Sequence, residues 1–107
     1  ERGAAPASPE RVCLVAMEGT RAAAIALARE LRREFPVECD VEGRGFGAQM
    51  KAAGKSGARF LVILGEAEWE RGEVALKDSA TGTQETLARA GLAAALRAKS
   101  QTTGERP

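Results

Sequence analysis

The residues of this 107-residue chain with the clearest capacity for chemistry are cations that follow a glycine-rich stretch. Arg44 lies within Gly43–Gly47, and Lys51 and Lys55 come next, four positions apart. Two lysines at this spacing on one helix face repel each other mildly unless an anion lies between them. Together the three cations could bind phosphates, and Arg44 could also stack on, or pair with, an exposed base. The pattern predicts a segment that binds an anion or RNA.

The glycines themselves allow two other interpretations. Gly43, Gly45 and Gly47 could form a nucleotide-binding loop, but the spacing G-x-G-x-G is neither the dinucleotide fingerprint nor a Walker loop. Glycines at these positions also suit a loop that needs tight backbone turns. The need for tight turns does not explain Arg44, an arginine between two glycines, whose flexible backbone and long side chain give it a long reach.

Two carboxylates, Glu66 and Glu68, form a second candidate group. Carboxylates accept hydrogen bonds from base amino groups when single-stranded bases are read. The same pair could serve a hydrolase, which requires one carboxyl group with a raised pKa in an apolar pocket. Neither glutamate lies within an apolar run, so contact with a base is the interpretation that we prefer.

The composition excludes the commonest catalytic groups. The chain has no histidine, which removes the usual serine and cysteine triads and the imidazole acid–base pair. Its two cysteines, Cys13 and Cys39, cannot supply a four-ligand metal site. Each lies in an apolar or alternating run, where a buried thiol is expected. We therefore expect no catalytic residue and no metal site in this chain.

The elements that position these residues follow from hydrophobic periodicity. Apolar runs at Val12–Met17 and Phe60–Leu64 predict strands that are buried on both faces. The alternating segment Val37–Glu42 predicts an edge strand with one wet face. Helices are expected at residues 21–34 and 46–57, in one turn at 67–71 with Trp69 inward, and in an alanine-rich segment after Leu87. Trp69 is interpreted as a core residue rather than a stacking platform.

These elements predict an α/β fold with a three-layer arrangement and helices on both faces of a five-stranded mixed sheet. Right-handed crossovers make the first three strands parallel in the order 2-1-3, and Asp78–Gly82 then turns an antiparallel hairpin. Ligands of such sheets bind beyond the carboxyl ends of the strands at the switch point. Loops 17–20, 43–47 and 65–68 reach that edge, which adds Met17 and Glu18 to the candidate site.

The ends of the chain differ from its middle. Residues 1–10 contain two prolines and are typical of a linker, residues 11–99 form one domain, and the polar residues 100–107 predict a disordered tail. The start lacks the pattern of a signal peptide, and the apolar runs are far too short to span a bilayer. We expect a cytoplasmic fragment of a longer protein, without membrane contact, whose missing part lies upstream.

Four segments resemble the C-terminal anticodon-binding domain of class II aminoacyl-tRNA synthetases, and most of all that of histidyl-tRNA synthetase. They are Val12–Met17, Gly43-Arg44 with Gln49–Lys51, Lys55–Phe60, and Leu64–Gln84. The resemblance covers about residues 11–97. Its most specific part is 65–84, where the related glycyl, threonyl and prolyl domains diverge, and the proline-bearing start is similar to the linker that leaves the catalytic domain.

The resemblance implies a non-catalytic, cofactor-free domain that binds the anticodon arm of histidine tRNA. The parent would be a histidine–tRNA ligase, a homodimer whose upstream catalytic domain uses ATP and Mg²⁺ and is the second partner of this domain. With the topology, it implies the following tRNA contacts: Met17, Glu18, Arg44, Gly45, Phe46, Gln49, Lys51, Lys55, Glu66 and Glu68.

The sequence departs from the family after Gly43-Arg44. The family usually has a serine, an aliphatic residue and two lysines there, and an aromatic residue beyond its glutamine. Those places are occupied here by Gly45, Phe46, Gly47, Ala48 and Ala52. Two cations and a possible stacking ring are therefore missing. The affinity for tRNA would be weaker, or other residues would supply it. Each lost phosphate contact would lower the slope of log K against log salt concentration (the salt slope) by about 0.7–0.9.

Two other functions stay open on the sequence. The chain could be an interaction or regulatory module of a catalytically inactive synthetase-like protein, which the missing cations favour slightly and the retained Arg44, Gln49 and Lys51 oppose. It could instead be a free-standing α/β domain that binds a small anionic ligand at the switch point.

Overall fold

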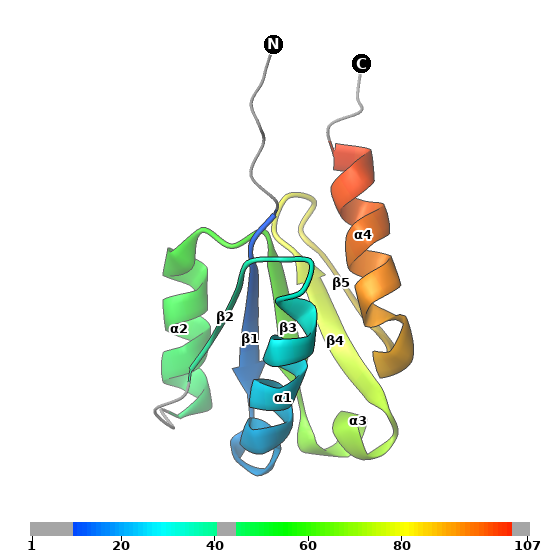
Figure 1. The fold of residues 1–107 in the computed structure, drawn as a ribbon. Helices are drawn as coiled ribbons and strands as arrows, with labels where there is room; N and C mark the ends of the chain where they lie inside the picture. The colour runs from blue at the N-terminus through cyan, green and yellow to red at the C-terminus, as the bar shows by residue number, and fades with distance from the viewer. Residues whose placement is uncertain (1–9, 41–44, 104–107) are drawn as a thin grey trace.

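The computed structural model describes residues 10–40 and 45–103, and its centre is a five-stranded mixed sheet in the order β2-β1-β3-β4-β5 (Figure 1). β1 is parallel to β2 and β3, whereas β4 is antiparallel to β3 and β5. The predicted order and hairpin are confirmed. The strands are β1 (Val12–Ala16), β2 (Val37–Cys39), β3 (Phe60–Leu64), β4 (Glu73–Asp78) and β5 (Thr83–Ala88).

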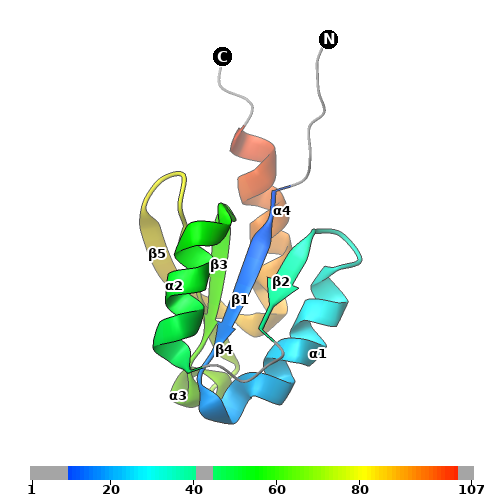
Figure 2. The same ribbon diagram turned by 90° about the vertical axis from the view of Figure 1, so that its left-hand side faces the viewer.

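Helices cover both faces of the sheet, with α2 on one face and α1 and α4 on the other (Figure 2). They are α1 (Arg21–Leu31), α2 (Phe46–Ser56), α3 (Glu66–Glu70) and α4 (Leu92–Thr103), and short 3-10 turns η1 (Glu18–Thr20) and η2 (Arg89–Gly91) precede α1 and α4. α1 ends before the predicted residue 34, and α4 runs past residue 99. Within the described ranges, no helix has the length and apolar character needed to cross a membrane.

The two faces of the sheet are covered unequally. The larger core packs Leu14, Phe60 and Leu76 of the sheet against α1 and α4, through Leu27 and Leu96 among others. A smaller core lies under α2 and consists of Cys13, Val15 and Ala53, with partly buried neighbours. β1 is buried along its whole length, but it ends at Ala16, and Met17, which was predicted to belong to this buried strand, is exposed. β3 is not buried along its whole length, because Leu61 and Ile63 are only half-buried on the face that α2 covers in part.

A buried ion pair fixes the start of β3 to the end of β4. Arg59 Nε and Nη2 each donate to one carboxylate oxygen of Asp78 at 2.9 Å, and Asp78 is 3% exposed. The same carboxylate accepts the backbone N–H of Ala80, so it also shapes the β4–β5 turn. The hydrogen bonds from Arg59 hold the pKa of Asp78 below its usual value. Arg59 Nη1 also lies 3.5 Å from Glu10 Oε2, so the guanidinium group has a second acidic neighbour.

The side-chain amide of Gln49 completes the sheet where β2 stops. β2 pairs with β1 from Val37 to Cys39, which lies opposite Leu14. Val12 N–H donates to Pro36 O on the β2 side, and backbone groups alternate along a strand, so those of Ala16 face the same side. Gln49 Oε1 accepts Ala16 N–H at 2.9 Å and its Nε2 donates to Ala16 C=O at 3.0 Å. This two-point pairing replaces a strand residue and fixes α2 to β1.

Substitution of Gln49 by Glu should lower stability in a pH-dependent way. At neutral pH the carboxylate can accept from Ala16 N–H but cannot donate to Ala16 C=O, and we expect a loss of about 2–4 kcal/mol. This environment raises the pKa of the new carboxyl group, and its protonated form can donate to Ala16 C=O, so the deficit relative to wild type should shrink as the pH falls through that folded-state pKa. Urea unfolding followed by circular dichroism measures the loss of stability and its change with pH. Gln49→Met is the control and should lose stability at every pH. A deficit for Gln49→Glu that does not change with pH would contradict this role.

Substitution of Asp78 by Asn should cost about 2–3 kcal/mol at neutral pH, because Arg59 loses the buried carboxylate to which it donates two hydrogen bonds. The folded-state pKa of Asp78 is lowered, so its contribution is present above the unfolded pKa of about 4 and is lost as the pH falls through the folded value. The curves of variant and wild type should therefore converge below about pH 4. Glu85→Gln is the control, since its exposed pair with Lys99 at 3.1 Å should contribute less than about 1 kcal/mol. If the free energies of unfolding of variant and wild type differ by the same amount at every pH, the pair is not a source of acid sensitivity.

Candidate nucleic-acid interface

A hollow of about 570 Å³ lies beyond the carboxyl ends of β1 and β3. Helices α1, α2 and α3 all begin at this edge of the sheet (Figure 1). The hollow is lined by Ala16, Met17, Glu18, Arg21, Gly45, Phe46, Gln49 and Glu66. Six of these are residues that the sequence placed at the site, and they come from three separate segments. The switch point between the two central strands therefore forms a concave surface, as the predicted topology requires.

The wall formed by η1 is tied to the end of β3. Met17 N–H donates to Leu64 O at 3.1 Å, and the hydroxyl of Thr20 lies 2.9 Å from the same oxygen and 2.8 Å from Met17 O. Thr20 is the N-cap residue of α1, and its hydroxyl bonds backward to these carbonyls rather than to the helix. The consequence is a fixed position for Met17 and Glu18 at the rim.

Glu66 links the two loops that flank the switch point. Its Oε2 accepts the backbone N–H of Gly19 at 2.8 Å. A Cβ at position 19 would lie 2.6 Å from this oxygen, so the approach requires a glycine there. A carboxylate has two oxygens and about four lone-pair sites. Glu66 can therefore hold η1 and still accept a hydrogen bond from a ligand in the hollow.

Apolar surface comes from both sides of the hollow. Met17 is 38% exposed, an unusual value for a large apolar side chain in the part of the chain that the structure describes. Phe46 opens α2 and is half-buried against the smaller core. Gln49 lies behind Phe46 with its amide bound to Ala16. The hollow thus combines apolar contact area with a carboxylate rim, which suits a flat, polar-edged ring.

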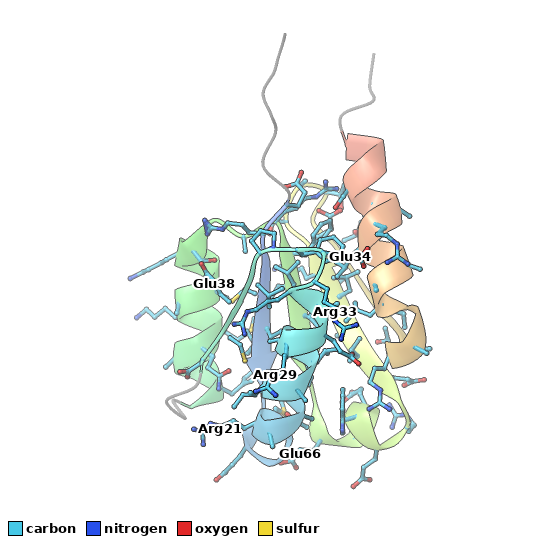
Figure 3. All side chains as sticks on the ribbon, viewed as in Figure 1. Arg21, Arg29, Arg33, Glu34, Glu38 and Glu66 are labelled. Carbon is cyan, nitrogen blue, oxygen red and sulfur yellow. The ribbon has the colours of Figure 1, made fainter. Side chains whose placement is uncertain are left out.

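Arg21 lines the hollow, although the sequence analysis did not assign it to the site. Figure 3 shows Arg21 and Glu66 at the same end of the sheet, beside the start of α1. The signal was its position, because Arg21 directly follows the loop 17–20 that the topology brings to this edge. Its guanidinium supplies a positive charge at a rim that otherwise carries carboxylates.

Three other predicted contacts, Lys51, Lys55 and Glu68, lie away from the hollow. Lys51 and Lys55 are exposed on α2, and Lys55 stands about 14 Å along the helix from its first residue. Glu68 folds back so that its carboxylate occupies the space of a Cβ on Gly65. Neither the lysines nor Glu68 line the hollow. Arg44 falls within residues 41–44, outside the described residues.

Trp69 is half-buried against the larger core, in agreement with its interpretation as a core residue. The guanidinium of Arg89 stacks over its ring, 4.3 Å from the centroid. Both residues line a second groove of about 240 Å³ beside α1, together with Glu30. Trp69 therefore lies apart from the hollow at the switch point.

The cysteines are unsuited to reaction. Burial raises the pKa of the Cys13 thiol to about 11, and it also raises that of Cys39. Both thiols are therefore protonated near neutral pH and lack the nucleophilic thiolate form. Among the described residues, no group of three or more His, Cys, Asp or Glu side chains is arranged to hold a metal ion.

Comparison with known proteins places this geometry in a family. A family model described as an anticodon binding domain matches residues 11–99. A histidine–tRNA ligase of Synechococcus sp. (strain RCC307) is 40% identical over 86 residues, which cover 79% of this chain and 21% of that protein. A histidine–tRNA ligase of Methanosarcina acetivorans is 38% identical over 82 residues, covering 77% of this chain and 20% of that protein.

The same similarity holds in three dimensions. The crystal structure of histidyl-tRNA synthetase from Nostoc sp. PCC 7120 superimposes with a TM-score of 0.73 and 32% sequence identity, over 86% of this chain and 22% of that one. The chain spans about a fifth of the length of the relatives that it matches. The match to the family model covers nearly all of the described residues, and the chain therefore belongs to the anticodon binding domain family.

Proposed function

We propose that this chain is the anticodon-binding domain of a histidine–tRNA ligase and that it binds the anticodon arm of histidine tRNA. The observation that carries the proposal is the hollow at the switch point, where six predicted residues from three segments meet. Its volume of about 570 Å³ is ample for an unstacked base. RNA sequence is read mostly from such unstacked bases, in loops.

The parent protein follows from the relatives. Those reported above are named as histidine–tRNA ligases or histidyl-tRNA synthetases, and this chain corresponds to about a fifth of each. We place the ATP- and Mg²⁺-dependent attachment of histidine in a separate catalytic domain of a homodimeric, cytoplasmic parent. The names of the relatives favour this assignment over a catalytically inactive, regulatory relative.

The hollow offers a physical basis for reading guanine. The anticodon that pairs with histidine codons is GUG, and the pairing edge of guanine presents two adjacent donors, N1–H and the N2 amino group. A carboxylate can accept both, whereas adenine offers a donor beside an acceptor at the same edge. Glu66 or Glu18 would supply the carboxylate, and Met17 and Phe46 would contact the faces of bases.

The remaining residues have supporting roles in this proposal. Gln49 is a positioning residue, because its amide is committed to Ala16 and fixes the wall of the hollow that Phe46 forms. Arg21 faces the hollow and would meet the phosphate next to a bound base. Arg44, outside the described residues, stays a sequence-based prediction, as do contacts of Gly45, Lys51, Lys55 and Glu68 with tRNA.

The direct test is binding of RNA stem-loops to the 107-residue chain. A stem-loop bearing GUG should bind at least roughly tenfold more tightly than one bearing AUA, because each mismatched base costs about 1–3 kcal/mol. Fluorescence anisotropy of labelled RNA at fixed salt concentration measures the ratio. Equal affinities for the two triplets would refute anticodon reading. Displacement of the RNA by inorganic phosphate alone would instead favour a site for small anions.

Substitution of Glu66 by Gln should reduce discrimination more than affinity. The amide oxygen can still accept Gly19 N–H, but the amide no longer offers guanine two acceptors. We expect the GUG-to-AUA ratio to fall roughly tenfold while AUA binding changes little. Glu70→Gln, an exposed carboxylate on the same helix, is the matched control. Equal weakening for both triplets would make Glu66 a purely structural residue.

A further inference from the structure

α1 carries a row of arginines that leads away from the hollow. Arg21 lines the hollow, and Arg29 and Arg33 follow on the exposed side of the helix and of the turn that ends it. At 1.5 Å per residue, Arg29 lies about 12 Å beyond Arg21 along the axis of α1, and Arg33 follows in the turn after the helix. Figure 3 shows the three following one another along α1.

The surface beside these arginines consists of small side chains and carries few acidic groups. Ala22 and Ala26 precede Arg29 and Arg33 at helical spacing, so small exposed side chains share the face with the two guanidinium groups. Two acids lie nearby. Glu34 pairs with Arg97 of α4 at 2.6 Å, and exposed Glu30 lines, together with Ala26, the groove that holds Trp69 and Arg89. The small side chains of Ala22 and Ala26 leave a polyanion room to approach Arg29 and Arg33.

α2 provides a direct comparison, since it also begins at the hollow. Its exposed face carries Lys51 and Lys55, the same four-residue spacing that relates Arg29 and Arg33. The first turn of α2, Phe46–Gln49, has no charged side chain, whereas the first turn of α1 has Arg21. Among the described residues, the cation nearest the hollow is therefore Arg21 at the start of α1, whereas the first cation of α2 is Lys51.

We propose that the phosphate backbone of the RNA stem that adjoins the bound loop runs along the outer face of α1, where Arg29 and Arg33 contact phosphates. The inference rests on the proposed function and specifies its second contact surface. Three helices begin at the edge where the hollow lies, and α1 is the one whose outer face carries arginines. The planar guanidinium group binds phosphate through two parallel hydrogen bonds, which the lysines of α2 cannot do.

Two matched double variants of the 107-residue chain test the proposal. Arg29→Gln with Arg33→Gln, and Lys51→Gln with Lys55→Gln, each remove two charges from one helix face and give the same net charge. Each is titrated with the GUG stem-loop and with a single-stranded RNA of the same loop sequence, across a range of salt concentrations. The arginine variant should bind the stem-loop roughly tenfold more weakly, with a salt slope lower by about 1.4–1.8, and should bind the single strand nearly as wild type does. The lysine variant should change less.

Other outcomes overturn the proposal. A loss confined to the lysine variant would place the stem along α2, and an equal loss in both would show only a general effect of net charge. Arg29 also lies near the carboxyl end of α1, where a cation stabilises the helix. If the double variant does not fold, Arg33→Gln alone, in the turn after the helix, should still lower the slope by about 0.7–0.9. A wild-type chain that binds the stem-loop without preferring GUG over AUA would refute the proposed function and leave the path along α1 measurable.

Discussion

The site depends on how the sheet closes after β2 stops. Ala16 presents a backbone donor and acceptor toward a strand that has already ended, and an unpaired buried group of either kind would be costly. The amide of Gln49 satisfies both at once. Because Gln49 comes from α2, these bonds fix that helix with its first residue at the edge of the hollow. The same two hydrogen bonds therefore satisfy Ala16 and hold one wall of the hollow.

The elements that bury most of the core differ from those that form the edge at the hollow. α1 and α4 bury the larger core, and the Arg59–Asp78 pair fastens the β4 hairpin to β3 at the opposite end from the hollow. The binding edge itself is built from helix starts and loops, which carry exposed N–H groups and a partial positive charge. Arginines on the outer face of α1 can add to this field, since their side chains take no part in the core.

Sequence periodicity was sufficient for the architecture. The apolar runs of β1 and β3, the turn at Asp78–Gly82 and right-handed crossovers together left one strand order. The half-burial of Leu61 and Ile63 was not predictable, because it depends on how far α2 extends across its face of the sheet. The site was predicted to the level of its loops. Lys55 was assigned to the site by its charge, but it lies nine residues along α2 from Phe46 and so away from the hollow. Arg21 was not assigned, because the sequence does not distinguish a charge at the start of a helix from an ordinary solvated charge.

The contact between Glu66 and Gly19 makes one side chain responsible for both the shape of the hollow and its chemistry. One carboxylate oxygen sets the distance between the walls of the hollow, and the other belongs to a group able to recognise a base. A new side chain at position 66 would alter the shape of the cavity along with its chemistry, and any larger residue at position 19 would displace the carboxylate. The shape of the hollow and the position of its carboxylate are therefore coupled through this one contact.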